Sequence, residues 1–273
     1  MRYKLFCSDF DGTLVRSDGT ISQKTKEEIA RYTKAGGIFT VVTGRMTESI
    51  LARVREFTNE GIVVSYQGAV ISDIRTGKLL KSEAFDLASA LRVVRLLEED
   101  NHHIHVYTAE GLFANRRDDM LDEYERICGV HGDESHSTLS AWMEKTGQTV
   151  IKILAIIEPE KRDALHEQLQ KKLGDAYFIT CSNDWLVEIM PAGKNKGGAI
   201  AFLSEYFRIP KEQIAAIGDQ LNDLPMLEAA GGKFAVANAT QELKRIANVV
   251  ASCDEDGVAE ALKLAREGDS YEQ

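Results

Sequence analysis

The sequence is poor in cysteine and lacks the spacings that cysteine-based sites need. Its four cysteines, Cys7, Cys128, Cys181 and Cys253, are scattered along 273 residues and form no C-x-x-C pair. The sequence therefore indicates neither a zinc site nor a disulfide framework. Isolated thiols of this kind are typical of a reducing compartment.

Long apolar runs are also absent. No stretch approaches the roughly 18 consecutive apolar residues that suggest a membrane-spanning helix. A signal peptide would need an apolar core where Asp9 and Asp11 stand. We therefore expect a cytoplasmic protein.

Basic residues are fewer than acidic residues, with 33 lysines and arginines against 43 aspartates and glutamates. The formal net charge is -10 at pH 7 and the isoelectric point is near 5.2, whereas nucleic acids and anionic membranes are bound by clustered basic faces. We expect neither as a partner. A single small anion is compatible with this charge, because lysine, backbone N–H groups and a bound cation can act together at one site. The sequence thus favours a small-molecule partner, with the chain as a monomer or a weak homo-oligomer.

The remaining composition is that of an ordinary globular protein, with 44% hydrophobic and 28% charged residues. The length fits one large α/β domain or two modest ones. We find no internal repeat and no low-complexity segment.

Apolar strands and amphipathic helices alternate in the first third of the chain. The expected order is strand Tyr3–Cys7, helix Ser22 to about Ala35, strand Ile38–Val42, a helix from about Thr47, and strand Ile62–Ser65. This βαβαβ pattern predicts a parallel sheet with helices on both faces. Ligands of such sheets bind beyond the carboxyl ends of the strands.

The middle of the chain predicts a different, antiparallel and strand-rich region. The expected elements are a hairpin at Thr76-Gly77, a helix over 86–100, strands over 103–107, 150–157, 177–181 and 185–190, and a helix over 159–173. Residues 118–149 are polar and mixed, and we expect one helix and a long loop there.

The α/β alternation resumes after Pro191. We expect a helix over 197–207, a strand over 214–217, a helix over 224–230, a strand over 234–236 and a final helix. The predicted architecture is therefore an α/β core of residues 1–81 and 191–273, interrupted by an inserted α+β domain of residues 82–190.

Two carboxylates stand directly after the first strand. Asp9 and Asp11 are at i and i+2, so in extended backbone both side chains can face one ligand. Gly12 then allows a sharp turn. One carboxylate could attack a phosphorus atom while the other gives and takes a proton. Taken alone, the segment is equally well explained by a solvated Asx-turn.

Three further polar segments follow strands or open helices. Thr43-Gly44-Arg45 follows the second strand, and its hydroxyl and backbone can donate to phosphate oxygens. Lys196 opens a helix, where an ammonium and backbone N–H groups can hold an anion. Asp219 and Asp223 follow the strand over 214–217, where carboxylates suit Mg²⁺. Each segment is unremarkable alone, but together they indicate a magnesium and phosphate site.

At this point the chain resembles the haloacid dehalogenase superfamily hydrolases of the Cof type, which carry a type IIB (C2) cap. The resemblance covers almost the whole chain and lies in D-F-D-G-T-L at Asp9–Leu14, V-V-T-G-R at Val41–Arg45, N-K-G-G-A-I at Asn195–Ile200, I-G-D-Q-L-N-D-L-P-M-L at Ile217–Leu227, V-A-N-A at Val236–Ala239 and D-G-V-A at Asp256–Ala259. It implies a Rossmann-like core with an inserted cap.

The resemblance also implies roles for the acidic residues. Asp9 would be the nucleophile and a ligand of Mg²⁺. Asp11 would be the general acid and base, and its backbone carbonyl would also meet the metal. Asp219 would be a metal ligand, and Asp223 a supporting acid that orients its loop and reaches the metal through water.

The phosphate-binding residues are implied in the same way. Phe10 would contribute its backbone, Thr43 and Gly44 would form the phosphate-binding turn, Lys196 would neutralise charge, and Asn222 would lie on the phosphate side. The implied activity is phosphate removal from a sugar phosphate, nucleotide or phosphorylated cofactor.

One departure from the family pattern is visible. Members usually carry Asn-Gly-Ala after the third strand, whereas this chain has Gln67-Gly68-Ala69. We assign no role to Gln67 from the sequence, and nothing in the inserted domain identifies the substrate.

Two other functions stay open. A phosphomutase would pass the phosphoryl group to a second hydroxyl instead of water, and Asp11 serves either reaction; the Cof-like last third favours hydrolysis. A non-catalytic phosphate-responsive binding module is disfavoured, because a phosphate acceptor alone does not need Asp11.

Three histidines are close together in the middle of the chain. On a strand, His103 and His105 share one face and His102 takes the other. Since no acid or cysteine stands nearby at a diagnostic spacing, we expect surface or cap-lining residues and not a zinc site.

Overall fold

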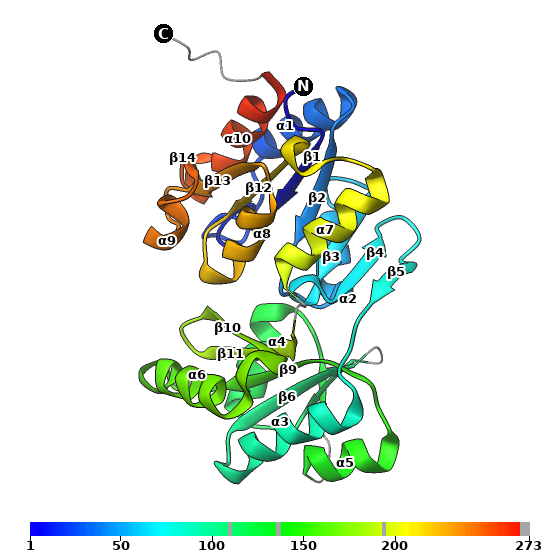
Figure 1. The fold of residues 1–273 in the computed structure, drawn as a ribbon, viewed down its shortest axis with the longest axis vertical. Helices are drawn as coiled ribbons and strands as arrows, with labels where there is room; N and C mark the ends of the chain where they lie inside the picture. Colours follow the sequence, from blue (N-terminus) through cyan, green and yellow to red (C-terminus); the bar gives the residue numbers. More distant parts are fainter. Residues whose placement is uncertain (109–110, 135–137, 193–194, 268–273) are drawn as a thin grey trace. The chain divides into compact units, whose positions relative to one another are not determined.

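The computed structural model describes residues 1–108, 111–134, 138–192 and 195–267. The chain forms two compact units, one of residues 1–81 with 195–273 and one of residues 82–194 (Figure 1). These bounds lie near the predicted domain limits. The second unit runs past residue 190 because its last strand, β11 (Leu186–Pro191), pairs through Pro191 with β10 (Tyr177–Asn183).

The first unit is built on a mainly parallel sheet. Its strands are β1 (Leu5–Ser8), β2 (Ile38–Val42), β3 (Ile62–Ser65), β4 (Val70–Asp73), β5 (Leu79–Ser82), β12 (Ile214–Gly218), β13 (Gly232–Val236) and β14 (Asn248–Val250). They lie in the order β14-β13-β12-β1-β2-β3-β4-β5. Strands β14 to β3 pair in parallel, and β4 turns back antiparallel to β3.

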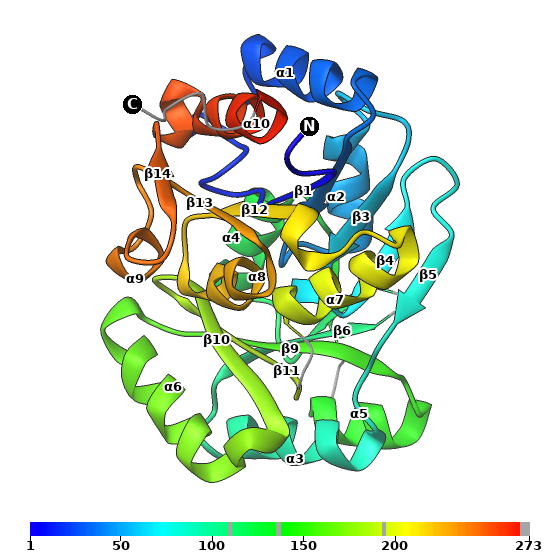
Figure 2. The same cartoon turned by 45° about the horizontal axis from the view of Figure 1, so that its top comes forward.

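Helices cover both faces of this sheet, as Figure 2 shows. Helices α1 (Gln23–Lys34) and α10 (Gly257–Glu267) pack together on one face, and α7 (Lys196–Phe207) and α8 (Leu224–Ala229) pack together on the other. Short helices α2 (Thr47–Val54) and α9 (Gln241–Lys244) follow β2 and β13. The predicted α/β class, with a parallel sheet between helices, is confirmed.

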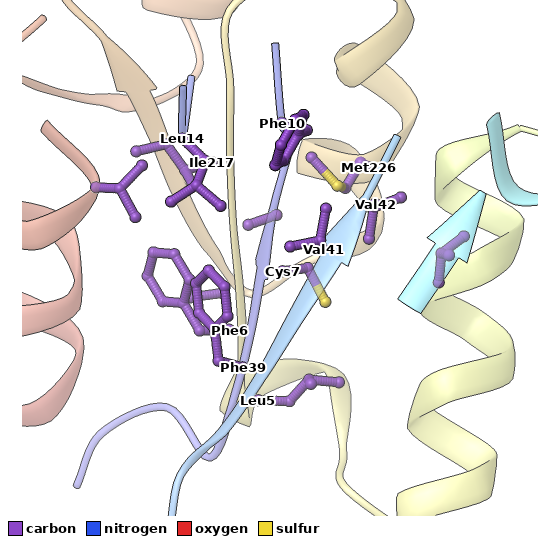
Figure 3. Packing of buried hydrophobic residues seen from close by; sticks show 14 of the residues in the cluster. Leu5, Phe6, Cys7, Phe10, Leu14, Phe39, Val41, Val42, Ile217 and Met226 are labelled. Atoms are coloured by element: carbon purple, nitrogen blue, oxygen red, sulfur yellow. The ribbon is translucent and has the colours of Figure 1, made fainter. Parts of the chain in front are cut away.

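Alternation along β1 gives each face its own core. Phe6 is fully buried and stacks on Phe39 and Phe234. The centroid of its ring lies 6.1 Å from that of Phe39 and 6.0 Å from that of Phe234. The ring of Tyr32, from α1, meets Phe6 edge-on. Figure 3 shows Leu5 and Cys7 on the opposite side of the strand from Phe6. Burial on both faces explains why β1 is an unbroken apolar run in the sequence.

The second unit contains a largely antiparallel sheet with helices. Its further strands are β6 (His103–Thr108), β7 (Leu112–Ala114), β8 (Gly132–Glu134) and β9 (Val150–Ile156), and its helices are α3 (Leu87–Glu99), α4 (Asp119–Cys128), α5 (Leu139–Thr146) and α6 (Pro159–Leu173). The strand order is β10-β11-β9-β6-β7-β8. The predicted α+β insertion is confirmed.

One prediction for this unit is wrong. Residues 118–149 do not form one helix and a long loop, because the described part of that segment contains α4, β8 and α5. Helix α5 buries Leu139 and Met143 in the same apolar cluster as α3. Strand β8 pairs with β7, which is distant in sequence, and such pairing leaves no periodic signal.

The histidine prediction is also partly wrong. His103 and His105 share a face, as expected, but both are buried and neither is a surface residue. A hydrogen bond of 3.0 Å joins Nδ1 of His103 to the carboxylate of Asp118, which caps α4. The acid that the local sequence lacked therefore comes from 15 positions away.

Among the described residues, no helix has the length and apolarity that crossing a membrane requires.

Candidate active site

The order of the strands brings distant loops to one edge of the first unit's sheet. Strands β12, β1 and β2 are adjacent and parallel, so the residues that follow them lie side by side beyond their carboxyl ends. These residues are Asp219, Asp9 and Thr43. The backbone N–H of Asp9 donates to Ile217, in β12, over 3.0 Å.

Three carboxylates meet at this edge. Asp9, Asp219 and Asp223 are buried, and one carboxylate oxygen of each lies within 4.8 Å of the others. Burial and then the charge of Asp223 raise the pKa of Asp9 well above its ordinary value. The same two causes raise the pKa of Asp219 to about 6. Both shifts mean that the folded protein holds these groups where negative charge is costly.

One ammonium group enters this cluster. Nζ of Lys196 donates to Oδ1 of Asp9 and, over 2.5 Å, to Oδ1 of Asp223. Lys196 is fully buried at the start of α7. Burial opposes its charge, but Asp223 and Asp9 outweigh that effect and raise its pKa.

The cluster fits a divalent cation. The ammonium of Lys196 carries one positive charge, which is less than three ionised carboxylates would need for neutrality. A divalent cation would supply the remaining positive charge. Carboxylate oxygens are the donors that Mg²⁺ prefers, and Mg²⁺ is often bound through one or two carboxylates together with a phosphate. The donor set of Asp9, Asp219 and Asp223 therefore matches the predicted metal.

Hydrogen bonds hold Asp219 and Asp223 in place. The hydroxyl of Thr13 donates to Oδ1 of Asp219 over 2.8 Å. Oδ2 of Asp223 accepts from the backbone N–H groups of Asp219 and Gln220, at 2.9 and 3.1 Å. Asp223 thus orients the loop after β12 with one oxygen and binds Lys196 with the other.

Gly12 allows the first loop to approach Asp219. Its φ is +75°, and a Cβ placed there would lie 2.6 Å from Oδ2 of Asp219. Nδ2 of Asn238 donates to the carbonyl of Gly12 over 2.8 Å and secures the turn. The glycine expected to reverse the chain is therefore also required by close contact with a carboxylate.

The side chain of Asp11 lies with Arg45. Nε of Arg45 donates to Oδ2 of Asp11 over 2.7 Å and Nη2 to Oδ1 over 2.6 Å, which is a bidentate pair. The Asp11 side chain is 53% exposed. Of the four residues predicted to meet the metal, Asp9, Asp219 and Asp223 have clustered carboxylates, and the predicted contact of the Asp11 carbonyl stays a prediction.

The residues predicted on the phosphate side line the same loops. Phe10 is fully buried, with its ring 5.2 Å below the Arg45 guanidinium. Oγ1 of Thr43, also buried, accepts from the backbone N–H of Arg45 over 3.2 Å. Asn222 is buried and contacts Gln67.

Sequence reasoning missed Thr13, Arg45 and Gln67. Thr13 and Arg45 stand inside motifs that were recognised, but their spacing does not tell which carboxylate each one meets. Gln67 was visible only as a departure from the family pattern. Its burial, at 1% exposure, has no signal in the local sequence.

Comparison with known proteins identifies close parallels. The family model described as haloacid dehalogenase-like hydrolase matches residues 6–262. The 5-amino-6-(5-phospho-D-ribitylamino)uracil phosphatase YitU of Bacillus subtilis is 29% identical over 266 residues, covering 95% of this chain and 96% of that protein. An HMP-PP phosphatase of Yersinia pseudotuberculosis is 28% identical, covering 95% and 94%.

A solved structure agrees with the family match. That of a haloacid dehalogenase-like hydrolase from B. subtilis superposes with a TM-score of 0.86 at 26% identity, covering 95% of this chain and 99% of that one.

Proposed function

The chain belongs to the family of haloacid dehalogenase-like hydrolases, and from this premise we propose that it is a magnesium-dependent phosphatase acting through a phosphorylated Asp9. Its relatives are named phosphatases. The observation that carries the proposal is the convergence of Asp9, Asp219 and Asp223 around Lys196 at the carboxyl edge of a parallel sheet.

In the first step, an oxygen of Asp9 attacks the phosphorus of the substrate. A bond forms between that oxygen and phosphorus, and the bond from phosphorus to the leaving oxygen breaks. Asp11 gives its proton to the leaving oxygen, which departs as an alcohol. The bidentate pair with Arg45 suits the carboxylate form, so Asp11 must leave Arg45 and take up a proton from water before it acts as the acid.

In the second step, water attacks the phosphorus of the aspartyl-phosphate. Asp11 accepts the proton of the water, the bond between Asp9 and phosphorus breaks, and inorganic phosphate leaves. The sum is one phosphate ester and one water converted to one alcohol and one phosphate.

Magnesium would be held by Asp9, Asp219 and Asp223, with the carbonyl of Asp11, and would supply positive charge against the phosphate. Lys196 adds a fixed charge and keeps Asp9 oriented. Because both neutralise the carboxylates, they favour the ionised form of Asp9 that attack requires.

Phosphate oxygens would be bound by the backbone of Phe10, by Thr43 and Gly44, and by Lys196 and Asn222. The inserted unit is assigned as the type IIB cap. The relatives named for 5-amino-6-(5-phospho-D-ribitylamino)uracil and for HMP-PP support a small phosphorylated metabolite as substrate, of the sugar phosphate, nucleotide or cofactor class.

The experiment is phosphate release from an aryl phosphate, followed by a panel of phosphorylated metabolites, with and without Mg²⁺. Magnesium-dependent release in the wild type and its loss in Asp9→Asn are expected. Transfer of the phosphoryl group to a second sugar hydroxyl without release would indicate a phosphomutase. Binding of phosphate with no turnover on any ester would indicate a binding module.

A further inference from the structure

A strained turn follows β3 beside the proposed phosphate site. Tyr66, Gln67 and Gly68 have successive φ angles of +49°, +54° and +104°. The first two are not glycine, and L residues with side chains are strained in the left-handed region. A conformation of this kind persists only where its surroundings hold it.

Backbone contacts tie the turn to neighbouring loops. The N–H of Tyr66 donates to the carbonyl of Arg45 over 3.0 Å, and the N–H of Gln67 to that of Thr43 over 2.9 Å. On its other side, Gly68 lies so close to the carbonyl of Asn195 that a Cβ would overlap it. The turn therefore touches both the loop after β2 and the residue before Lys196.

The Gln67 side chain reaches a third loop. Its amide oxygen accepts from Nδ2 of Asn222 over 3.2 Å. Its Nε2 packs against Gly44, where a Cβ would lie only 2.5 Å away. One buried amide thus spans from the Thr43-Gly44 turn to the loop after β12.

Asn222 has hydrogen-bonding capacity left. Its amide group has two N–H donors, of which Gln67 takes one. Its Oδ1 is buried and has no hydrogen-bond partner among the described residues. A buried unpaired acceptor is costly. Because phosphate oxygens also accept, a water or a ligand hydroxyl would pair with Oδ1, and the second N–H is the group that can donate to phosphate.

We propose that Gln67 is a positioning residue: its amide orients Asn222 and sets its separation from the Thr43-Gly44 turn, so that the second N–H of Asn222 meets the substrate phosphate. The inference rests on the proposed function. In this proposal Gln67 acts through Asn222 and not directly on a reacting atom.

The test is a double-mutant cycle of Gln67→Met and Asn222→Ala. Methionine has similar length, but its thioether is only a weak acceptor for the N–H of Asn222. With an aryl phosphate and Mg²⁺, Gln67→Met should raise KM about fivefold, the effect of roughly one hydrogen bond, and change kcat little. The double variant should be no worse than Asn222→Ala, because the two side chains act as one unit. The inference would be overturned if the KM increases of the two single variants multiplied in the double variant. It would also be overturned if KM were unchanged in Gln67→Met.

A second variant separates positioning from folding. Gln67→Gly removes the amide and also relieves the left-handed strain, so its melting temperature should stay near that of the wild type while KM rises as in Gln67→Met. A KM that stays at the wild-type value in Gln67→Gly would contradict the inference.

Calorimetric titration with inorganic phosphate in the presence of Mg²⁺ tests the inference without turnover, because it measures phosphate affinity directly. Weaker phosphate binding in both Gln67 variants supports the inference even if the wild type hydrolyses no ester, a result that would defeat only the proposed function. Unchanged phosphate affinity in both variants defeats the inference even if the wild type is an active phosphatase.

Discussion

Lys196 and Asp9 form a buried ion pair although 187 positions separate them in the chain. The contact places the first residue of α7 beside the residue that follows β1. The same ammonium also binds Asp223, 27 positions further on. The nucleophile proposed here is therefore oriented by a residue that the chain supplies only after the inserted unit.

Replacement of Asp9 by asparagine should abolish turnover. The amide cannot form the phosphorylated intermediate, so we expect phosphate release to fall by at least about 10³-fold while circular dichroism stays that of the wild type. With an aryl phosphate, whose leaving group needs little protonation, Asp11→Asn should be nearly inactive in turnover but should accumulate the phosphorylated enzyme, detectable by intact mass, since its second step lacks a base. Substantial turnover by purified Asp9→Asn would contradict the covalent route.

Replacement of Lys196 by methionine should destabilise the fold as well as reduce activity. It leaves Asp9 and Asp223 buried beside each other without the ammonium, and removing one partner of a buried pair costs about 3–5 kcal/mol. Urea denaturation measures the loss. Lys263→Met, on the exposed side of α10, is the matched control and should change the unfolding free energy by less than about 0.5 kcal/mol. Equal effects of the two substitutions would refute a structural role for the ion pair.

Removal of divalent cations should lower both activity and melting temperature. A ligand that binds only the folded state stabilises it, so the wild type should melt higher with Mg²⁺ than with a chelator. In Asp219→Asn this difference should largely disappear. Without metal, Asp219→Asn should melt no lower than the wild type, because it relieves repulsion from Asp223. A magnesium-induced rise as large in the variant as in the wild type would remove Asp219 from the metal site.

The main strands and the chemistry-bearing loops were predictable because apolar runs end abruptly in polar segments. Helix α6 was predicted with the bounds that the structure has, since Pro159 suits a first helical turn and Gly174 ends it. The four segments at Asp9, Thr43, Lys196 and Asp219 were found for the same reason.

Contacts made by long-range pairing were not predictable. Strands β7 and β8 have three residues each, too few for a period, and they form only because they pair. The bond between Gln67 and Asn222 spans 155 positions and depends on a strained turn that no propensity indicates. The pairing of Asp11 with Arg45 likewise follows from side-chain placement and not from a motif.

Acid should destabilise the second unit through its buried histidines. Nε2 of His103 and Nε2 of His105 are 2.9 Å apart. Burial lowers the pKa of His103, against the opposing effect of Asp118, and burial, His103 and Lys152 lower that of His105 well below 6.5. In the unfolded chain both imidazoles take a proton below about pH 6.5. Since the folded state resists protonation, the unfolding free energy should fall as pH drops below that value.

The charged groups near His103 and His105 have opposing effects on the protonation of these histidines. Asp118 favours a charged His103, while Arg116 and Lys152 oppose charge on His103 and His105 respectively. Urea midpoints at about pH 7.5 and about pH 5 should therefore differ less in His105→Gln than in the wild type. The exposed His131→Gln is the control and should keep the wild-type difference. The same pH difference in His105→Gln and the wild type would show that the pair does not titrate with unfolding.

Two glycines with the same backbone angle should respond differently to alanine. Gly61 and Gly68 both have φ of +104°. At Gly61 a Cβ would meet only ordinary contacts, the nearest at 3.8 Å, so Gly61→Ala should cost about 1–2 kcal/mol from backbone strain alone. At Gly68 the Cβ would overlap the carbonyl of Asn195, so Gly68→Ala pays the same strain and must also displace the residue before Lys196.

Gly68→Ala should therefore lose at least about 1 kcal/mol more unfolding free energy than Gly61→Ala in urea denaturation. It should also lose activity, because a shift of Asn195 moves the helix start that carries Lys196, whereas Gly61→Ala should keep wild-type kcat and KM. Because both glycines have the same φ, the backbone strain is the same in the two variants. The difference in unfolding free energy therefore measures the contact between residue 68 and Asn195. Equal stability losses, with activity intact in both variants, would mean that the turn after β3 does not restrain the lysine.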